Sequence, residues 1–231
     1  MQNAPTTGRP LEFDPEKTRA EIMRLFWEKG FTAVSLPELE ARTGLSRSSL
    51  YNSFGSKQEI FGQALERYRR EVGEQMCRPL EAGTRGLADL LEFFDAAARQ
   101  FSSPAGAAGC LLVNSMVEFG GADEAVAGHV SEHLARLRRA LAGTLERAAK
   151  LGEVPSGHAE EKANLVLGLL LGITVSARAG LPRAEVGAMV EAARTQIRGW
   201  SVKPARRHRL VTRPWRNLTF PSLPRRKYQA F

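Results

Sequence analysis

The segment Phe31–Phe61, FTAVSLPELEARTGLSRSSLYNSFGSKQEIF, carries the strongest structural signal in the chain. Ser35 opens an S-x-x-E capping box, which predicts the start of a short helix, and Gly44 is free to take the positive φ that ends one. Ser46 predicts the start of a second short helix two residues later. Two short helices joined by a tight turn with glycine predict a helix-turn-helix, with its second helix over residues 47–53.

The second of these helices has the chemistry of a DNA-contacting surface. Between Arg42 and Gln58 there are three cations and no carboxylate, as a phosphate-facing surface requires. Serine and tyrosine hydroxyls suit phosphates, whereas Arg47, Ser48 and Asn52 suit base edges in the major groove. The alternative is a polar, well-capped helical hairpin in some other kind of domain. The residues predicted to contact DNA are Ser35, Arg42, Ser46, Arg47, Ser48, Ser49, Tyr51, Asn52 and Lys57.

The same stretch resembles the helix-turn-helix signature of the tetracycline-repressor (TetR) family, a G-[VL]-S turn followed by L-Y-x-x-F-x-x-K-x-x-[LI]. The matching residues are Gly44, Leu45, Ser46, Leu50, Tyr51, Phe54, Lys57 and Ile60. The resemblance implies that Tyr51 and Lys57 contact the DNA backbone, while Leu50 and Phe54 pack the small domain. It also implies a homodimer on double-stranded operator DNA and a helical C-terminal regulatory domain. One residue, Thr43, departs from the more usual Ala.

Outside this segment the apolar spacing is helical almost throughout, and no alternating segment predicts a strand. We therefore expect an all-α protein of about nine helices. Its N-terminal three-helix DNA-binding domain should span residues 14–65, and a helical ligand-binding and dimerisation domain should span residues 66–202. The remaining residues, 203–231, form a basic tail that we expect to be disordered.

One predicted helix is apolar on every side between Leu165 and Val175, so more than one of its faces must be buried. Gly168 and Gly172 lie four residues apart and allow another helix to approach closely. We predict that the homodimer forms through helices around 163–178 and 183–200.

The net charge of +8 belongs to the tail and not to the predicted domains. Residues 203–231 carry nine Lys and Arg and no acid, whereas residues 1–202 have a net charge of −1. The tail can add sequence-independent phosphate contacts or be an extension without a selected role. A membrane- or RNA-associated binder acting through the tail is an alternative to the operator-binding protein.

Composition excludes several other classes of protein. Two cysteines cannot form a disulfide framework, and no C-x-x-C spacing suggests a metal site. The N-terminus lacks the apolar segment of a secretory signal. The uncharged apolar run at residues 163–177 is shorter than the roughly 20 residues of a membrane span. We expect a cytoplasmic protein that is not an enzyme and binds no membrane, metal or cofactor.

The family resemblance also implies an effector pocket among the central helices of the second domain. The residues expected at it are Phe93, Phe94, Phe101, Cys110, Met116 and Phe119. The alternative is that these are ordinary core residues, because aromatic side chains dominate cores. A mixed apolar pocket predicts a small hydrophobic or aromatic effector.

Cys110, in AGCLLVN, lies at the predicted start of a helix, where free N–H groups favour a thiolate. The segment resembles one subgroup of the family in which such a cysteine senses oxidants or electrophiles. The alternative is a small buried apolar residue. We therefore predict a ligand- or redox-responsive repressor, released from its operator by a small hydrophobic effector or by thiol modification.

His129, Glu132 and His133 match H-x-x-E-H, the inverzincin peptidase pattern. Two histidines four residues apart on one helix can hold Zn²⁺, with the glutamate as base. A solvated polar helix face explains the same residues without a metal, so a peptidase is only an alternative to the DNA-binding function.

Overall fold

The computed structural model describes residues 13–102 and 104–202, and these residues contain helices and no strand. The elements are α1 (Pro15–Lys29), α2 (Leu36–Thr43), α3 (Arg47–Phe54), α4 (Lys57–Tyr68), the π-helical turn η1 (Arg69–Gly73), α5 (Glu74–Ala82), α6 (Leu87–Ser102), the 3-10 turn η2 (Pro104–Ala108), α7 (Leu111–Phe119), α8 (Glu124–Lys150), α9 (Ala159–Arg178) and α10 (Arg183–Arg198). Because α4, η1 and α5 are continuous, the described part has nine separate α-helical segments besides the 3-10 turn η2. The all-α prediction is confirmed, and the predicted disorder of residues 203–231 lies outside the described residues.

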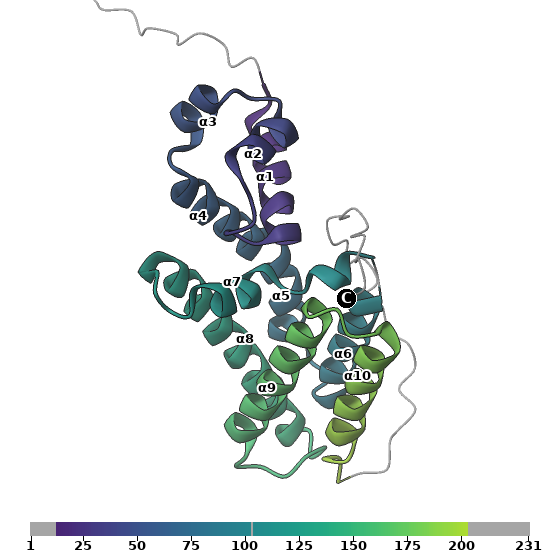
Figure 1. The fold of residues 1–231 in the computed structure, drawn as a ribbon. Coiled ribbons are helices and arrows are strands. Elements are labelled where there is room, and N and C mark those ends of the chain that lie inside the picture. Colours follow the sequence, from purple (N-terminus) through teal and green to yellow (C-terminus); the bar gives the residue numbers. More distant parts are fainter. Residues whose placement is uncertain (1–12, 103, 203–231) are drawn as a thin grey trace, which may run out of the picture.

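The first four helices form a compact unit at one end of the molecule (Figure 1). The capping residues and the glycine that predicted the helix ends lie at those ends in the structure. Asp14 accepts hydrogen bonds from the N–H groups that begin α1, and capping boxes at Ser35 and Ser56 begin α2 and α4. Gly44 has φ +72° and ends α2 in the left-handed region. Leu50 and Phe54 turn inward from α3 into an aromatic core, so the other side of α3 faces outward.

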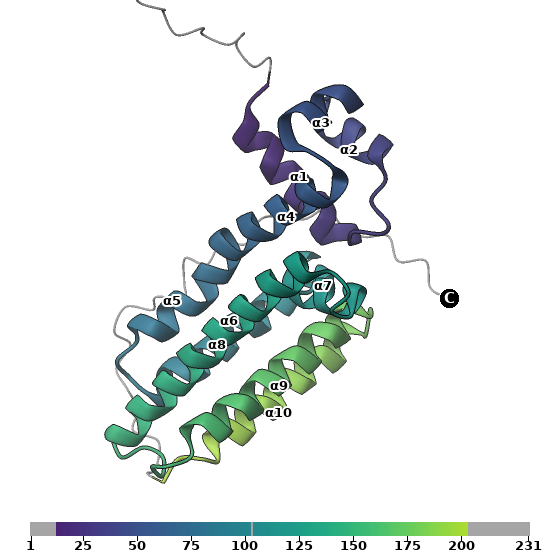
Figure 2. The ribbon, with the colours of Figure 1, turned by 90° about the vertical axis from the view of Figure 1, so that its left-hand side faces the viewer.

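A single long rod made of α4, η1 and α5 connects this unit to the rest of the chain (Figure 2). The turn η1 has the wider π-helical hydrogen-bonding pattern, which inserts a residue into an otherwise regular helix. Such π turns are frequent at functional sites. Here the turn falls where the rod leaves α1 and begins to pack on α8.

The second half is a bundle in which α8 packs on α9 and α6 packs on α10 (Figure 1). Leucine, valine and phenylalanine side chains from α5, α6, α8, α9 and α10 form its core, including Phe93, Phe94 and Leu141. None of the helices within the described ranges is long and apolar enough to cross a membrane.

The core of the N-terminal unit does not stop at α4. Leu111 and Leu112 of α7 and Val126 and Val130 of α8 are buried in the same apolar cluster as Phe26 and the other core residues of α1–α4. The predicted boundary at residue 65 therefore separates two helical units that share buried surface. A displacement of α7 must disturb the packing of the first unit.

Candidate nucleic-acid interface and buried pocket

The outward face of α3 is polar and accessible. Arg47, Ser48, Tyr51 and Asn52 are exposed, and the fraction of Tyr51 in contact with solvent is 37%. The Arg47 guanidinium lies 5.6 Å from the centre of the Tyr51 ring, a cation–π contact that aligns the two side chains on this face. A rigid helix with hydrogen-bonding and cationic groups on one side is the geometry that reads a DNA groove.

The predicted serines have different positions around this helix. Ser46 caps α3, where its Oγ accepts the Ser49 N–H at 3.3 Å and lies 3.0 Å from the Oγ atoms of Ser48 and Ser49. Ser35 lies at the start of α2 and donates both its N–H and its hydroxyl to the Glu38 carboxylate, at 2.8 and 2.9 Å. Ser46, Ser48 and Ser49 thus form one hydroxyl cluster at the N-terminus of α3, apart from Ser35.

Arg42 is held by carboxylates of α1. Its Nη1 and Nη2 donate to the two oxygens of Glu28 at 3.2 and 2.9 Å, and Glu21 lies at 3.7 Å. These hydrogen bonds raise the pKa of Arg42, and only 8% of the Glu28 side chain is exposed. The partner of Arg42 is therefore a nearly buried carboxylate, which sequence reasoning missed because Glu28 lies on another helix.

Carboxylates also border the interface, although the sequence between residues 42 and 58 has none. Glu40 accepts the Arg47 N–H at 2.7 Å, and Glu59 caps α4. Lys29 and the donors of Ser35 lower the pKa of Glu38 to about 2. Each of these carboxylates is hydrogen-bonded within the N-terminal unit, and Glu38 is also paired with the Lys29 ammonium. Lys57, the first residue of α4, has its Nζ 4.4 Å from the centre of the Phe31 ring, in the turn between α1 and α2.

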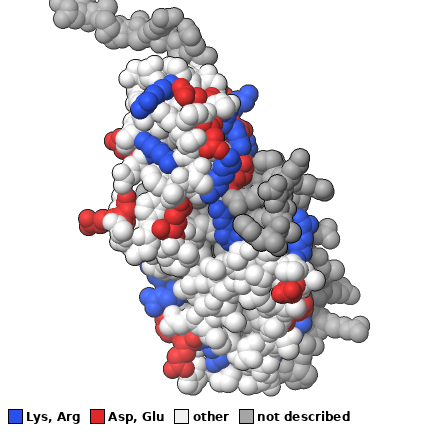
Figure 3. All heavy atoms as spheres, in the orientation of Figure 1, with Lys and Arg blue, Asp and Glu red and all other residues white. Residues whose placement is uncertain are grey.

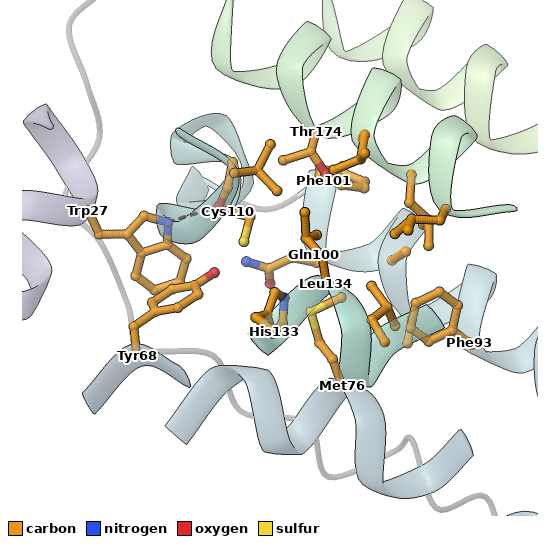
Figure 4. Close-up of a pocket in the computed structure, with 18 residues that line it drawn as sticks. Trp27, Tyr68, Met76, Phe93, Gln100, Phe101, Cys110, His133, Leu134 and Thr174 are labelled. Carbon is orange, nitrogen blue, oxygen red and sulfur yellow. Dashed lines mark hydrogen bonds between the residues drawn. The ribbon is translucent and has the colours of Figure 1, made fainter. Parts of the chain in front are cut away.

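A cavity of about 70 Å³ lies between the two halves of the molecule (Figure 4). Trp27 and Tyr68 close the end that faces the DNA-binding unit, and their rings meet edge to face at 4.9 Å. The other lining residues come from α5–α9 and the turn before α7: Met76, Phe93, Ala96, Ala97, Gln100, Phe101, Gly109, Cys110, Val113, His133, Leu134, Leu137, Leu167, Leu170, Leu171 and Thr174.

Three of the six predicted ligand-binding residues line this cavity, namely Phe93, Phe101 and Cys110. The other three lie elsewhere. Phe94 is fully buried in the bundle core, and Met116 packs on the core of the N-terminal unit. Phe119 contacts Phe31 and Phe61 with ring centres 5.2 and 5.7 Å apart. Phe94 on α6 and Met116 and Phe119 on α7 belong to helices that line the cavity, but their side chains pack elsewhere.

Cys110 is the residue that precedes α7, as the sequence predicted. Burial raises the pKa of its thiol, and the opposing effects of the Val113 N–H, the Tyr68 hydroxyl and the Leu112 N–H are too small to reverse this shift. The helix start therefore does not produce a thiolate at neutral pH, contrary to the expectation from its position alone. The thiol is protonated and shares the cavity with Tyr68.

The H-x-x-E-H residues do not converge on one point. His129 Nδ1 lies 3.8 Å from Glu66, and Glu132 binds Arg69 at 2.8 Å. His133, by contrast, lies in the cavity (Figure 4). Within the part of the chain that is described, no three His, Cys, Asp or Glu side chains are grouped as metal ligands. Because the three side chains lie in different places, they argue against the peptidase alternative.

Three polar contacts join the N-terminal unit to the cavity and to its neighbouring helices. The Trp27 indole donates to the Gly109 carbonyl at 2.8 Å, next to Cys110. At the other end of α7, the Glu118 carboxylate accepts the N–H groups of Phe31 and Thr32 at 3.0 and 2.7 Å. Arg178 of α9 donates to the Glu28 carbonyl at 2.9 Å. The helix α7 is thus tied at one end to the cavity and at the other to the turn that leads into α2.

Two family models match the chain, and together they cover more than half of it. Residues 20–64 match "Bacterial regulatory proteins, tetR family", and residues 86–196 match "Tetracyclin repressor-like, C-terminal domain". The chain is 28% identical to the HTH-type transcriptional repressor ComR of Escherichia coli K12 over 84% of this chain and 91% of ComR. It is 34% identical to the repressor BdcR of the same organism, over 47% of this chain and 55% of BdcR.

Solved structures give the same result. A cysteine-substituted form of the TetR family regulator CifR, in complex with 26-base-pair operator DNA, superposes with a TM-score of 0.71 at 28% identity and covers 84% of this chain and 100% of CifR. A TetR family regulator from Cytophaga hutchinsonii has the same fold, with a TM-score of 0.71 at 21% identity over 82% of this chain and 95% of its own. The matched proteins are regulators, which confirms the expectation that the chain is not an enzyme.

Proposed function

Because the chain belongs to the TetR family of DNA-binding transcriptional regulators, we propose that it is a homodimeric repressor whose operator is read by α3. The observation that carries this proposal is the exposed polar face of α3, with Arg47, Ser48, Tyr51 and Asn52 outward and Leu50 and Phe54 in the core. Arg47, Ser48 and Asn52 are the base-reading candidates. Tyr51, Lys57 and the Ser46 cluster contact phosphates.

Ser35 and Arg42 have different proposed roles, because their polar groups already have partners. Ser35 is bonded to Glu38, and Arg42 is bonded to Glu28. We assign Ser35 to capping α2 and Arg42 to fixing α2 against α1. They position the reading helix without supplying a major contact to DNA.

Selection of bound sequences from a random pool of DNA duplexes by the purified chain tests the operator proposal. A two-fold symmetric site is expected, with half-sites separated by about one helical turn, roughly 34–36 Å. Tyr51→Ala and Lys57→Ala should each weaken binding to the selected duplex about tenfold, since each removes a phosphate contact. Failure to enrich any sequence, or an enriched site without symmetry, contradicts the proposal.

The proposed dimer surface includes α9 and α10, within residues 163–178 and 183–200. Large apolar side chains remain accessible there, with exposed fractions of 47% for Leu165 and 40% for Val175. The face over α9 carries few charged side chains (Figure 3). Sedimentation analysis should give a dimer for the native chain and a monomer for Leu165→Glu with Val175→Glu. A dimer that survives both substitutions requires a different interface.

The proposed signal is a small apolar effector in the cavity, or modification of the Cys110 thiol. Either one acts only by stabilising a conformation that fits the operator less well. The link is α7, which joins Cys110 and Gly109 at the cavity to Glu118 at the turn before α2. Operator release by N-ethylmaleimide tests the thiol branch, and full release of the Cys110→Ser variant would exclude it.

A further inference from the structure

The imidazole of His133 lies almost wholly inside the protein, in the lining of the cavity. Only 4% of His133 is exposed, and its ring has no hydrogen-bond partner among the described residues. It points into the cavity from α8 (Figure 4). Buried polar groups are almost always hydrogen-bonded, since leaving one unpaired costs free energy. The ring is therefore suited to a partner that is not part of the protein.

The surroundings of His133 define the chemistry of that partner. Among the described residues that line the cavity there is no Asp, Glu, Lys or Arg. Burial, together with the positive charges of Arg136 and Arg69, lowers the pKa of His133 to about 4, so the ring is neutral at physiological pH. A neutral imidazole offers one N–H donor and one nitrogen acceptor. A hydroxyl or a carbonyl can pair with it, whereas a charged ligand finds no counter-ion in the cavity.

The cavity also limits the size of the partner. Its volume of about 70 Å³ is roughly half of the ~150 Å³ cavity that accommodates benzene. A single ring enters only if the walls separate, and the walls include the flexible side chains of Met76 and Leu134. The position of a Cβ atom on Gly73 would lie 3.2 Å from His133 Nδ1, so the ring packs directly on the backbone of η1. A ligand at His133 therefore contacts the rod that carries the reading unit.

We propose that His133 is the polar anchor of the effector site, and that the effector is an uncharged apolar molecule no larger than one ring that carries a hydroxyl or carbonyl group. This inference rests on the proposed effector role of the cavity. His133 sets specificity, and the apolar walls supply most of the contact area.

Calorimetric titration with phenol, toluene and benzoate tests the anchor, because these probes share a ring and differ in one group. The ratio of phenol affinity to toluene affinity should fall about tenfold in His133→Leu, the value of one hydrogen bond of typical net strength. His129→Ala is the matched control, since it removes a histidine of the same helix that lies outside the cavity lining, and its ratio should equal that of the native chain. Benzoate should bind at least tenfold more weakly than phenol.

An unchanged ratio in His133→Leu, benzoate affinity equal to that of phenol, or no phenol binding overturns the proposal. A second measurement avoids any dependence on the fold of the variant. In the native dimer, phenol should shift the ¹⁵N resonances of the His133 ring and leave those of His129 in place, and the reverse pattern also overturns the proposal. Operator binding is measured in a separate experiment. If the phenol titration refutes the role of His133, the proposed repressor function is unaffected. If the chain binds no operator, the role of His133 in phenol binding is unaffected.

Discussion

Arg42→Ala separates a structural role from a DNA-binding role at the same position. The sequence places Arg42 on a cationic surface, and the structure places its guanidinium on the Glu28 carboxylate. With Arg42 in place, only 8% of the Glu28 side chain is exposed, and truncation of Arg42 removes the guanidinium that pairs with it. We expect a loss of stability and an almost unchanged salt dependence of DNA binding.

The magnitude follows from the burial of the two partners. Removing one member of a buried ion pair costs roughly 3–5 kcal/mol. Because 27% of the Arg42 side chain is exposed, water can reach part of the site, and we expect a smaller loss of about 2 kcal/mol in the free energy of unfolding. Replacing Glu28 by Gln in the same chain removes the unpaired charge, so the double variant should recover about 1 kcal/mol.

Urea unfolding gives the stability, and fluorescence anisotropy of the selected operator duplex at several salt concentrations gives the DNA contact. A lost phosphate contact reduces the slope of log K against log salt concentration by about 0.9. Lys57→Ala is the matched control, with this slope change and a stability loss below about 1 kcal/mol. If Arg42→Ala changes the slope like Lys57→Ala and leaves stability intact, Arg42 is a DNA contact and the reasoning from its pairing is wrong.

Three further predictions concern stability, each measured by urea unfolding. Gly44→Ala should cost about 1–2 kcal/mol because φ is +72° with open space around it, and Gly30→Ala should cost more, since its Cβ would also approach Glu118 Oε2 to 2.8 Å. Glu38 has a pKa of about 2 in the folded chain against 4.5 in the unfolded chain, so its contribution to the free energy of unfolding is present above pH 4.5 and is lost as the pH falls towards 2. The difference in the free energy of unfolding between the native chain and Glu38→Gln should therefore disappear over that range. His133 has a folded pKa of about 4 against 6.5, so the unfolded chain binds the extra proton, and the native chain should lose roughly 3 kcal/mol between pH 6.5 and 4 that His133→Leu does not lose.

The helix-turn-helix could be predicted because its signals are local. A cap, a glycine and a second cap act within a few residues, and the structure has them at Ser35, Gly44 and Ser46. The alternation of buried and exposed positions on α3 follows from the period of the α-helix, which is also a local property of the chain. The matched pair of Arg42 and Glu28 could not be predicted, because two helices must pack before those side chains meet.

The cavity was predicted only in outline, for the same reason. Trp27 and Tyr68 belong to the N-terminal unit and the connecting rod, and no local pattern indicates that they reach the second domain. Phe93 and Phe94 are adjacent in the sequence, yet only Phe93 lines the cavity. His133 belongs to a metal-binding pattern in the sequence. In the structure it lies in the lining of an apolar cavity, where its imidazole is neutral and suited to hydrogen bonding.

The small size of the effector site constrains how the protein can switch. A ligand shifts an equilibrium only by the difference in its affinity for the two states, and inverting a 99:1 ratio requires about 5.5 kcal/mol. A ligand with a Kd of ~0.1 mM binds with about 5.5 kcal/mol in total. Complete release by a one-ring effector is therefore possible in two ways. In the first, the effector binds almost only to the released conformation. In the second, the released conformation of the free dimer lies within a few kcal/mol of the operator-binding one. The apolar core shared by the two units favours the second way, a small free-energy difference between the two conformations. Leu111 and Val130 bind α7 and α8 to the reading unit, so that a small movement of α7 is transmitted without breaking a separate interface.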